Sequence, residues 1–571
     1  MSMNEAEYLD RLRALWAKNW PAGVPREPRY PLGEIPLSEY LRERARRTPA
    51  KPAVIFYGTE LSYGELDRLS DRFAALLASE GVSKGDRVAV FLPTCLQFHI
   101  AFYGILKLGA VHVPVNPMFR EHELLHELED TGAEVMVAQD QLMPLVRQVL
   151  PRTKLRRVFV TSVAETLPEA PAIPVPEGVA APRIACPDAV DLLPALEACT
   201  APVPRTVPGL DDVAALNYTG GTTGLPKGCI HTQRDMIYTA ATVCGRHASA
   251  EAAEQEVSLS FYQLFWIAGE NTGLIVPVFC GSTLVELSRW DPVGWMAAVE
   301  RYKVTSAGML VDNAVAIMDH PDVARYDLRS LRRTGVSSFV KKLNTDYRRR
   351  WEALTGVTMA ESAWGMTETH THDTFTTGMQ ADDWDLKQQP IFVGLPVPGT
   401  EFKICSFETG EILPLGAEGE IVVRSPSQLK GYWNKSEATA ASIRDGWFHT
   451  GDIGVLDEGG YLHFLGRRKE MLKVTGMSVF PAEIEAMLGR HPAVVGSGVV
   501  GRPDEKRGQV PVAFVLLAEA AQGRLTEAEL AAWCRANMAT YKVPEIRFVD
   551  SLPMTATGKV KKEELAKQHF A

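Results

Sequence analysis

The chain has 571 residues and a formal net charge of −10. Because one hydrophobic core rarely supports so long a chain, we expect at least two domains. The acidic balance and the lack of a long basic run argue against a nucleic-acid partner, which would need an excess of lysine and arginine on one face.

The eight cysteines are scattered along the chain, and none forms a CxxC pair. This usage is typical of reduced thiols, so we expect a cytoplasmic protein with no disulfide scaffold and no structural zinc. The first helical pattern includes Glu5, Glu7 and Asp10, and it lacks the basic and then apolar order of a signal peptide.

Short apolar strands alternate with amphipathic helices between residues 51 and 140. Strands are predicted over 87–92 and 111–115, with a helix over 97–108 between them. This alternation is typical of α/β layers around a mostly parallel sheet.

The two most apolar stretches span residues 98–115 and 272–285. Lys107 interrupts the first and Pro277 the second, so we expect buried helices and strands and no membrane span. Residues 164–208 are instead rich in Pro, Ala and Glu with little periodicity, and we expect a surface excursion there.

A run rich in glycine and threonine follows, from Tyr218 to Gly228. Its glycines let successive N–H groups face an anion, its threonine hydroxyls add donors, and Lys227 can balance phosphate charge. The run is not a Walker A loop, because Gly228 and not Ser or Thr follows Lys227. A phosphate-binding loop is the functional interpretation, and an ordinary glycine-rich hairpin or linker is the alternative.

A second motif spans Glu361 to Glu368. An aromatic ring such as Trp364 can stack on a purine, Gly365 lets a ligand approach the backbone, and Thr367 and Glu368 can hold a phosphate and its magnesium ion. The alternative is a buried strand end with an exposed acid.

Two further motifs lie toward the C-terminus. In the run 447–452, Asp452 can accept hydrogen bonds from a ribose diol. Arg467 and Lys469 follow in a basic turn that could equally be a solvated surface. Near the end of the chain, Lys559 sits on a Thr-Gly turn, where a lysine without further context is most often a solvated surface charge.

These four motifs, in this order, resemble those of the adenylate-forming superfamily, which includes acyl-CoA synthetases, firefly luciferase and the adenylation domains of peptide synthetases. The resemblance covers nearly the whole chain. It implies an α/β fold with a large N-terminal domain of layered β-sheets and helices, residues 1–468, which holds the ATP and acyl pocket. A small mobile α+β C-terminal domain, residues 469–571, would carry the adenylation lysine.

The chain departs from the usual family pattern at several positions. Gly220 replaces a serine, which removes one hydroxyl donor to phosphate, and Trp364 replaces a tyrosine. Phe339 stands where relatives often have a small residue, and Lys562 takes the place of an arginine-like residue after the terminal lysine. Whether these departures reduce activity is left open.

The resemblance implies an ATP-dependent enzyme that activates an organic carboxylic acid as an acyl adenylate, with Mg²⁺ as cofactor. Coenzyme A would then accept the acyl group as a thioester, with release of AMP and pyrophosphate. Two alternatives stay open, namely delivery of the acyl group to a carrier-protein phosphopantetheine and a non-catalytic nucleotide-binding homologue. The sequence leaves the oligomeric state open, with a homodimer as one candidate assembly.

The same resemblance assigns roles to individual residues. The catalytic residues would be Lys559, Glu368, Thr367 and Lys473, of which Glu368 also holds the metal. Lys469 would be the hinge between the domains, and Lys473 and Gly476 would approach coenzyme A. The residues that bind ATP or AMP would be Thr219, Gly220, Gly221, Thr222, Thr223, Gly224, Lys227, Ser337, Ser338, Ala363, Trp364, Gly365, Thr367, Asp452 and Arg467.

The acyl pocket is expected to include Trp266, Ile267, Gly269, Phe339 and Met366. Amino-acid-activating relatives carry an aspartate near this segment, but residues 260–269 here offer no counter-ion for a substrate ammonium group. Because Trp266 and Phe339 are large, we expect a short, branched or ring-containing acid in preference to a long straight chain. The alternative is that both aromatic side chains fill core.

Overall fold

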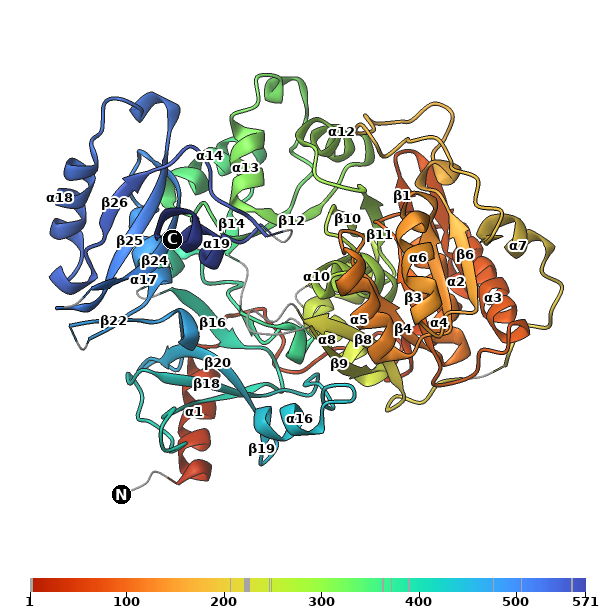
Figure 1. Cartoon of the computed structure of the whole chain (residues 1–571), viewed down its shortest axis with the longest axis horizontal. Helices are drawn as coiled ribbons and strands as arrows, with labels where there is room; N and C mark the ends of the chain where they lie inside the picture. The colour runs from red at the N-terminus through yellow and green to blue at the C-terminus, as the bar shows by residue number, and fades with distance from the viewer. Residues whose placement is uncertain are drawn as a thin grey trace.

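The computed structural model describes residues 4–205, 207–219, 226–245, 247, 249–361, 364–370, 372–388, 391–475, 477–504, 506–555 and 558–570. These residues form four β-sheets, of which three lie in a large N-terminal lobe and one in a smaller C-terminal lobe (Figure 1). This is the mixed α/β architecture of large and small domains that the sequence predicts.

The first sheet has the strand order β7-β6-β5-β3-β4-β8-β9. Its neighbours are parallel except for β8 and β9, which form an antiparallel hairpin. The mostly parallel sheet and the strands predicted over 87–92 and 111–115 are therefore confirmed. The strands are β3 (Arg87–Phe91), β4 (Val111–Pro114), β5 (Val135–Gln139), β6 (Arg157–Thr161), β7 (Val190–Asp191), β8 (Val213–Thr219) and β9 (Lys227–Thr232).

The second sheet has the order β14-β13-β12-β10-β11-β1-β2 and is parallel except for the β1–β2 pair. Because β10, β12, β13 and β14 are parallel, their carboxyl ends meet at one edge of the sheet, where ligands commonly bind in α/β proteins. The strands are β1 (Pro52–Phe56), β2 (Thr59–Ser62), β10 (Val257–Ser260), β11 (Thr283–Glu286), β12 (Ser306–Leu310), β13 (Arg333–Ser337) and β14 (Met359–Glu361).

Helices connect and cover these strands. They are α2 (Leu37–Arg47), α3 (Tyr63–Ser79), α4 (Leu96–Leu108), α5 (Glu121–Thr131), α6 (Met143–Val149), α7 (Leu192–Ala198), α8 (Gln233–Cys244), α9 (Ala250–Glu254), α10 (Ile267–Gly269), α11 (Val276–Cys280), α12 (Pro292–Tyr302), α13 (Val311–Met318) and α14 (Thr345–Thr355). A π-helical turn, Glu270–Ile275, joins α10 to α11.

Helix α4, which lies in the first of the two apolar stretches, is a buried helix. Every residue in it is buried, including Lys107, whose Nζ lies 2.9 Å from Oδ1 of Asp71 and also pairs with Asp67. Burial lowers the pKa of Lys107, and the two carboxylates oppose that effect. The predicted buried helix is confirmed. Among the residues that the structure describes, no helix is both long and apolar enough to cross a membrane.

The expectation for residues 164–208 needs a correction. This stretch contributes β7, which pairs in parallel with β6, and α7, whose Leu192 and Leu196 are buried. Leu192 and Leu196 are one helical turn apart and therefore face the core together. Two apolar residues at this spacing are too few to stand out in a stretch rich in proline.

The third sheet is antiparallel and includes β15 (Thr374–Phe375), β16 (Phe392–Pro396), β17 (Glu401–Cys405), β18 (Gly419–Arg424), β19 (Ile443–Arg444), β20 (Trp447–Leu456) and β21 (Leu462–Arg467). Helix α1 (Glu5–Asn19) packs against it (Figure 1). Two indole N–H groups fix this packing, because Trp16 donates to the carbonyl of Gly460 at 2.8 Å and Trp447 donates to Glu5 at 3.1 Å. Helices α15 (Trp384–Lys387) and α16 (Ser436–Ser442) complete this region.

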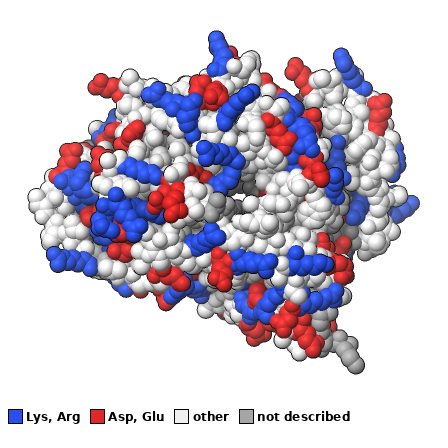
Figure 2. All heavy atoms as spheres, turned by 180° about the vertical axis from the view of Figure 1, so that it is seen from behind, with Lys and Arg blue, Asp and Glu red and all other residues white. Residues whose placement is uncertain are grey.

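The C-terminal lobe follows a short turn, Arg468–Glu470. Its sheet contains β22 (Leu472–Val474), β23 (Met477–Val479), β24 (Val494–Asp504), β25 (Gly508–Leu517) and β26 (Glu545–Phe548), with helices α17 (Pro481–Leu488), α18 (Glu527–Asn537) and α19 (Lys562–Phe570). The lobe has its own apolar core between the sheet and the helices. Acidic and basic side chains are interspersed over the face shown in Figure 2, around a hollow near its centre.

Candidate active site

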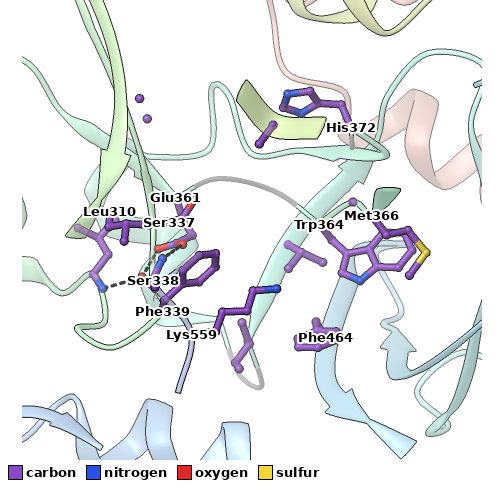
Figure 3. Close-up of a pocket in the computed structure, with 18 of the residues that line it drawn as sticks. Leu310, Ser337, Ser338, Phe339, Glu361, Trp364, Met366, His372, Phe464 and Lys559 are labelled. Atoms are coloured by element: carbon purple, nitrogen blue, oxygen red, sulfur yellow. Dashed lines mark hydrogen bonds between the residues drawn. The ribbon is translucent and has the colours of Figure 1, made fainter. Parts of the chain in front are cut away.

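A cavity of about 3230 Å³ lies where the carboxyl ends of the second sheet meet the third sheet and the C-terminal lobe. Residues from all three parts line it. In Figure 3, Lys559 from the C-terminal lobe reaches between Phe339 on one side and Trp364 with Met366 on the other. The structure thus brings several residues of the four sequence motifs to one place.

Asp452 is fixed by its position in the sheet. It pairs across β20 and β21 with Arg467, and the Nε of Arg467 lies 2.6 Å from Oδ1 of Asp452. The indole N–H of Trp364 donates to Oδ2 of the same carboxylate at 3.0 Å. Burial raises the pKa of Asp452 to about 6, while Arg467 and Trp364 hold it down.

Trp364 itself is buried and packs edge to face on Phe402, with ring centroids 5.7 Å apart. The resemblance places this indole against adenine. The structure adds that its N–H is already used on Asp452, so the ring orientation is set before any nucleotide binds. Gly365, next in the chain, lines the cavity, whereas Ala363 lies outside the described residues.

The Thr367–Glu368 turn is held from behind by groups that the sequence motifs do not contain. His231 contacts the carbonyl of Thr367 through Nε2 at 2.8 Å, and the N–H of Leu429 donates to the carbonyl of Glu368 at 2.8 Å. The hydroxyl of Tyr432 donates to Oε1 of Glu368 at 3.1 Å. Sequence reasoning missed His231 and Tyr432, although His231 follows the glycine-rich run closely in the chain.

Glu368 offers a magnesium ion a single protein carboxylate. Its carboxylate faces the cavity, and among the described residues no cluster of three histidine, cysteine, aspartate or glutamate side chains could form a metal cage. Mg²⁺ in nucleotide sites is usually held by one or two carboxylates together with the phosphates of the substrate. A single carboxylate at this position suits that mode of binding.

The two ends of the glycine-rich run lie on the β8–β9 hairpin. Thr219 ends β8 and Lys227 begins β9, and both line the cavity. The Nζ of Lys227 lies 4.0 Å from the centroid of the Tyr432 ring, which also contacts Glu368. The residues between them, Gly220, Gly221, Thr222, Thr223 and Gly224, lie outside the described residues.

A buried carboxyl group lies under this hairpin. Asn217 of β8 donates through Nδ2 to Oε2 of Glu270 at 2.8 Å, and Glu270 begins the π-helical turn. Burial raises the pKa of Glu270 to about 8, with the Asn217 hydrogen bond opposing the shift. The contact ties the β8–β9 hairpin to the segment after Trp266. A lone glutamate in an apolar stretch of the sequence gave no signal of this contact.

Ser337 ends β13 and Ser338 follows it, and both line the cavity. The backbone N–H of Ser338 donates to Oε1 of Glu361 at 2.8 Å, and its hydroxyl donates to Oε2. Burial raises the pKa of Glu361 to about 7, and the hydrogen bonds from Ser338 partly offset this. Glu361 is therefore a structural anchor for the loop that follows β13.

Not every residue of the expected acyl pocket lines the cavity. Trp266, Ile267 and Met366 line the cavity, but Gly269 does not appear among its described lining residues. Gly269 is buried, and a Cβ atom there would overlap the carbonyl of Gln263. This glycine allows two backbone segments to approach each other, a need that a motif alone cannot distinguish from a pocket wall.

Lys559 extends from a tight turn at the end of the C-terminal lobe. Its N–H donates to the hydroxyl of Thr555 at 2.9 Å, and Gly558 in the turn has φ of +81°. The protein around this lysine and the neighbouring Arg467 lower the pKa of Lys559, and Asp452 opposes them. The side chain lines the cavity and is exposed to the space within it.

The other predicted residues of the small lobe lie elsewhere. Lys469 lies in the connecting turn and lines the cavity. Lys473 lies on β22, is exposed, and is absent from the described lining of the cavity. Gly476 lies outside the described residues. Lys562 is paired with Glu470 at 2.9 Å and with Glu485 at 3.1 Å, so it links α19 to the connecting turn and to α17.

Two family models match the chain. One describes an AMP-binding enzyme and matches residues 41–433, and the other describes the AMP-binding enzyme C-terminal domain and matches residues 483–559. Among curated relatives, a long-chain-fatty-acid–CoA ligase of Bacillus subtilis (strain 168) is 32% identical over 97% of this chain and 98% of its own length. 4-Coumarate–CoA ligase 2 of Oryza sativa subsp. japonica is also 32% identical, over 93% of this chain and 92% of its own.

Solved structures agree. The anthranilate CoA ligase AuaEII in complex with anthranoyl-AMP has a TM-score of 0.79 at 26% identity and covers 93% of this chain and 97% of its own. ATP-bound MatB from Rhodopseudomonas palustris has a TM-score of 0.76 at 25% identity and covers 93% and 98%. The fold and enzyme class predicted from the sequence are thereby confirmed. The chain belongs to the AMP-binding enzyme family and is an acid–thiol ligase, which activates a carboxylic acid with ATP and joins it to coenzyme A.

Proposed function

We propose that this chain activates a ring-containing or branched carboxylic acid in the cavity around Lys559, and that coenzyme A then receives the acyl group. The observation that carries the site assignment is the position of Lys559 in the cavity lining, beside the Asp452–Arg467 pair. The domain boundary between residues 468 and 469 belongs to the same proposal, and the short connecting turn between two separate cores supports it.

The first half-reaction must overcome charge repulsion, because a carboxylate has to attack the α-phosphate of a polyanion. Lys559 would lie between the attacking carboxylate and that phosphate and stabilise the charge that develops on the phosphoryl oxygens. Lys227, at the base of the phosphate loop, would balance charge on the leaving pyrophosphate. A bound Mg²⁺ on Glu368 would withdraw further charge from the phosphates.

The nucleotide would be oriented by the cavity wall that contains Asp452 and Trp364. Asp452 is held in its ionised form by Arg467 and Trp364, so it can accept hydrogen bonds from the ribose hydroxyls. Thr367 and Ser337 would contact the phosphate and adenine ends, respectively, of the same nucleotide. Because Trp364 is already fixed, binding of the base would lose little side-chain entropy.

The second half-reaction would use the other face of the small lobe. In the arrangement described, Lys473 is exposed and outside the cavity lining, so a rotation about Lys469 would be needed to bring Lys473 and Gly476 to the adenylate. Delivery to a carrier-protein phosphopantetheine is the second candidate, since a tethered thiol could use the same approach. The CoA-ligase names of the relatives favour free coenzyme A.

Aromatic side chains support the proposed class of acid. Phe261, Tyr262, Phe265 and Trp266 line the cavity together with Trp290, and the Tyr262 ring packs directly on Gly308 of β12. Rings of this kind stack well on a planar acyl group and obstruct a long straight chain. The fatty-acid and coumarate ligases are equally identical to this chain, so the proposed acid class rests on the cavity lining.

The site proposal can be tested in one reaction with ATP, Mg²⁺, coenzyme A and a pool of short, branched, aromatic and long-chain acids, read by mass spectrometry. We expect AMP and an aromatic or branched acyl-CoA, both absent in Lys559→Ala. Trp266→Gly should extend the accepted range toward longer acids. A wild-type product made only from long straight chains would overturn the acid class, and AMP without thioester would favour a carrier-protein acceptor.

Cellular location and assembly are further parts of the proposal. A cytoplasmic location is supported by the eight cysteines, all of which carry free thiols. A homodimer would be revealed by light scattering of the purified protein.

A further inference from the structure

The loop that follows β13, residues 338–342, is held rigidly to the N-terminal lobe. We call it the docking segment. Ser338 is bound to Glu361 through its N–H and hydroxyl groups, and the N–H of Lys341 donates to Asp312 at 3.2 Å. The Nζ of Lys342 donates back to the carbonyls of Ser338, at 3.2 Å, and Phe339, at 2.9 Å. These bonds fix the direction in which Phe339 and Val340 project.

Val340 projects into a notch in the C-terminal lobe. It packs against the apolar cluster of Val500, Val512, Phe514, Leu552 and Leu565, all of which belong to that lobe. The floor of the notch is Gly496 of β24, where an added Cβ atom would overlap Cγ1 of Val340 but would lie 3.7 Å from its Cβ. The missing side chain at Gly496 is therefore what admits the methyl groups of Val340.

Phe339 contacts the turn that carries the adenylation lysine. The Nζ of Lys559 lies 5.3 Å from the centroid of the Phe339 ring, within the range of a cation–π interaction. An added Cβ at Gly558 would lie 3.7 Å from the same ring. Figure 3 shows Phe339 beside Lys559 at the cavity wall. Phe339 is thus as much a support for Lys559 as a wall of the acyl pocket.

We infer that the docking segment holds the C-terminal lobe in the adenylating arrangement, with Val340 in the Gly496 notch and Phe339 under Lys559. The inference rests on the proposed function, because it assumes that Lys559 serves adenylation and that the lobe rotates before thioester formation. Both contacts join the two lobes, so rotation must break them. They therefore stabilise one arrangement relative to the other and bias the enzyme toward the first half-reaction.

The first test compares the two half-reactions, with ATP–pyrophosphate exchange for adenylation and thioester formation from the synthetic acyl adenylate of an accepted acid. Gly496→Ala should lower exchange about tenfold through overpacking at the notch, with thioester formation unchanged or faster. Adding Val340→Ala to Gly496→Ala should restore exchange to the level of Val340→Ala alone, because the two Cβ atoms can coexist. Val549→Ala is the matched control, since Val549 packs on the same cluster from within the small lobe.

Equal loss of both half-reactions in Gly496→Ala, or failure of the double variant to recover, would overturn the inference. For Phe339, we expect Phe339→Leu to lower exchange more than thioester formation, because leucine keeps bulk but loses the ring face. Thermal unfolding of each variant separates a folding defect from a shift in arrangement. A wild-type protein inactive in both half-reactions would instead contradict the proposed function.

A second measurement needs no activity. Lys303 and Arg524 are both exposed, one in each lobe. Nitroxide labels at Lys303→Cys and Arg524→Cys report the distance between the lobes by pulsed electron paramagnetic resonance. Gly496→Ala should shift the distance distribution away from that of the parent, and the added Val340→Ala should return it. An unchanged distribution in Gly496→Ala would mean that the notch does not set the arrangement of the lobes.

Discussion

The two faces of the C-terminal lobe differ sharply in their surroundings. On one face Lys559 lines the cavity among Arg467, Asp452 and the Phe339 ring. On the other, Lys473 is exposed on β22, and its backbone N–H donates to the side chain of Gln509 within the same lobe. One rigid arrangement cannot bring both lysines to the same substrate. Under the proposed function, the arrangement described suits the first half-reaction, and the second needs a movement of the lobe.

The largest effect is expected from removing the lysine that reaches into the cavity. Lys559→Ala should lower ATP–pyrophosphate exchange about 10³-fold, because it removes preorganised charge stabilisation. Thioester formation from supplied acyl adenylate should survive. Parallel loss of both activities would break the two-face interpretation. Lys561→Ala, which alters an exposed lysine two residues further on, is the matched control.

The next effect concerns the turn between the lobes. Lys469→Pro fixes one backbone angle in the turn Arg468–Glu470 and should hinder rotation. We expect thioester formation to fall about a hundredfold while pyrophosphate exchange is kept, as is common when a conformational step is blocked. Lys469→Ala, which removes the side chain but leaves the backbone free, should retain both. If proline slowed exchange alone, the pivot would lie elsewhere.

A smaller effect is expected at the exposed face. A contact with a charged group contributes about 1.5–3 kcal/mol, so Lys473→Ala should slow thioester formation about tenfold or more and leave exchange unchanged. Lys506→Ala, at another exposed position of the same lobe, should change neither. Loss of exchange in Lys473→Ala would show that this lysine acts already in the first half-reaction.

The smallest effect is expected from lowering the pH. The folded-state pKa of Asp452 is raised to about 6, so its ionised form is lost as the pH falls through that value. The ionised form pairs with Arg467 and, under the proposed function, accepts hydrogen bonds from ribose. Exchange should therefore decline below about pH 6, and Asp452→Asn should be slow at every pH. The raised pKa of Asp452 has the opposite pH dependence in its contribution to the stability of the folded state. The folded state binds the proton more tightly than the unfolded state, so this contribution is present at low pH and is lost as the pH rises toward 6.

Much of the architecture could be predicted from the sequence, because strand and helix periodicities are local. Helix α4 and strands β3 and β4 lie within a residue of their predicted positions. The motifs also named residues that do meet in the cavity, such as Lys559 and Trp364. What they could not give were contacts set by sheet packing, such as the bond from Trp364 to Asp452 across 88 positions of sequence.

The supporting residues were equally hidden. Tyr432 contacts Glu368 and His231 contacts Thr367, although the two residues of each pair are far apart in the chain. Neither Tyr432 nor His231 belongs to one of the four motifs. Phe339 was predicted as a pocket wall because it is large and stands where relatives often have a small residue. Its contact with Lys559 depends on how the small lobe docks, which no local pattern records.

The packing of α1 on the third sheet has a consequence for synthesis of the chain. The bonds from Trp16 to Gly460 and from Trp447 to Glu5 join residues 444 and 442 positions apart. At roughly 5–20 residues per second, a ribosome would take about 20–90 s to produce the partner of the first helix. Through that interval the apolar side of the nascent helix has no native place to bury, so an early chaperone contact at the N-terminus would protect the emerging polypeptide.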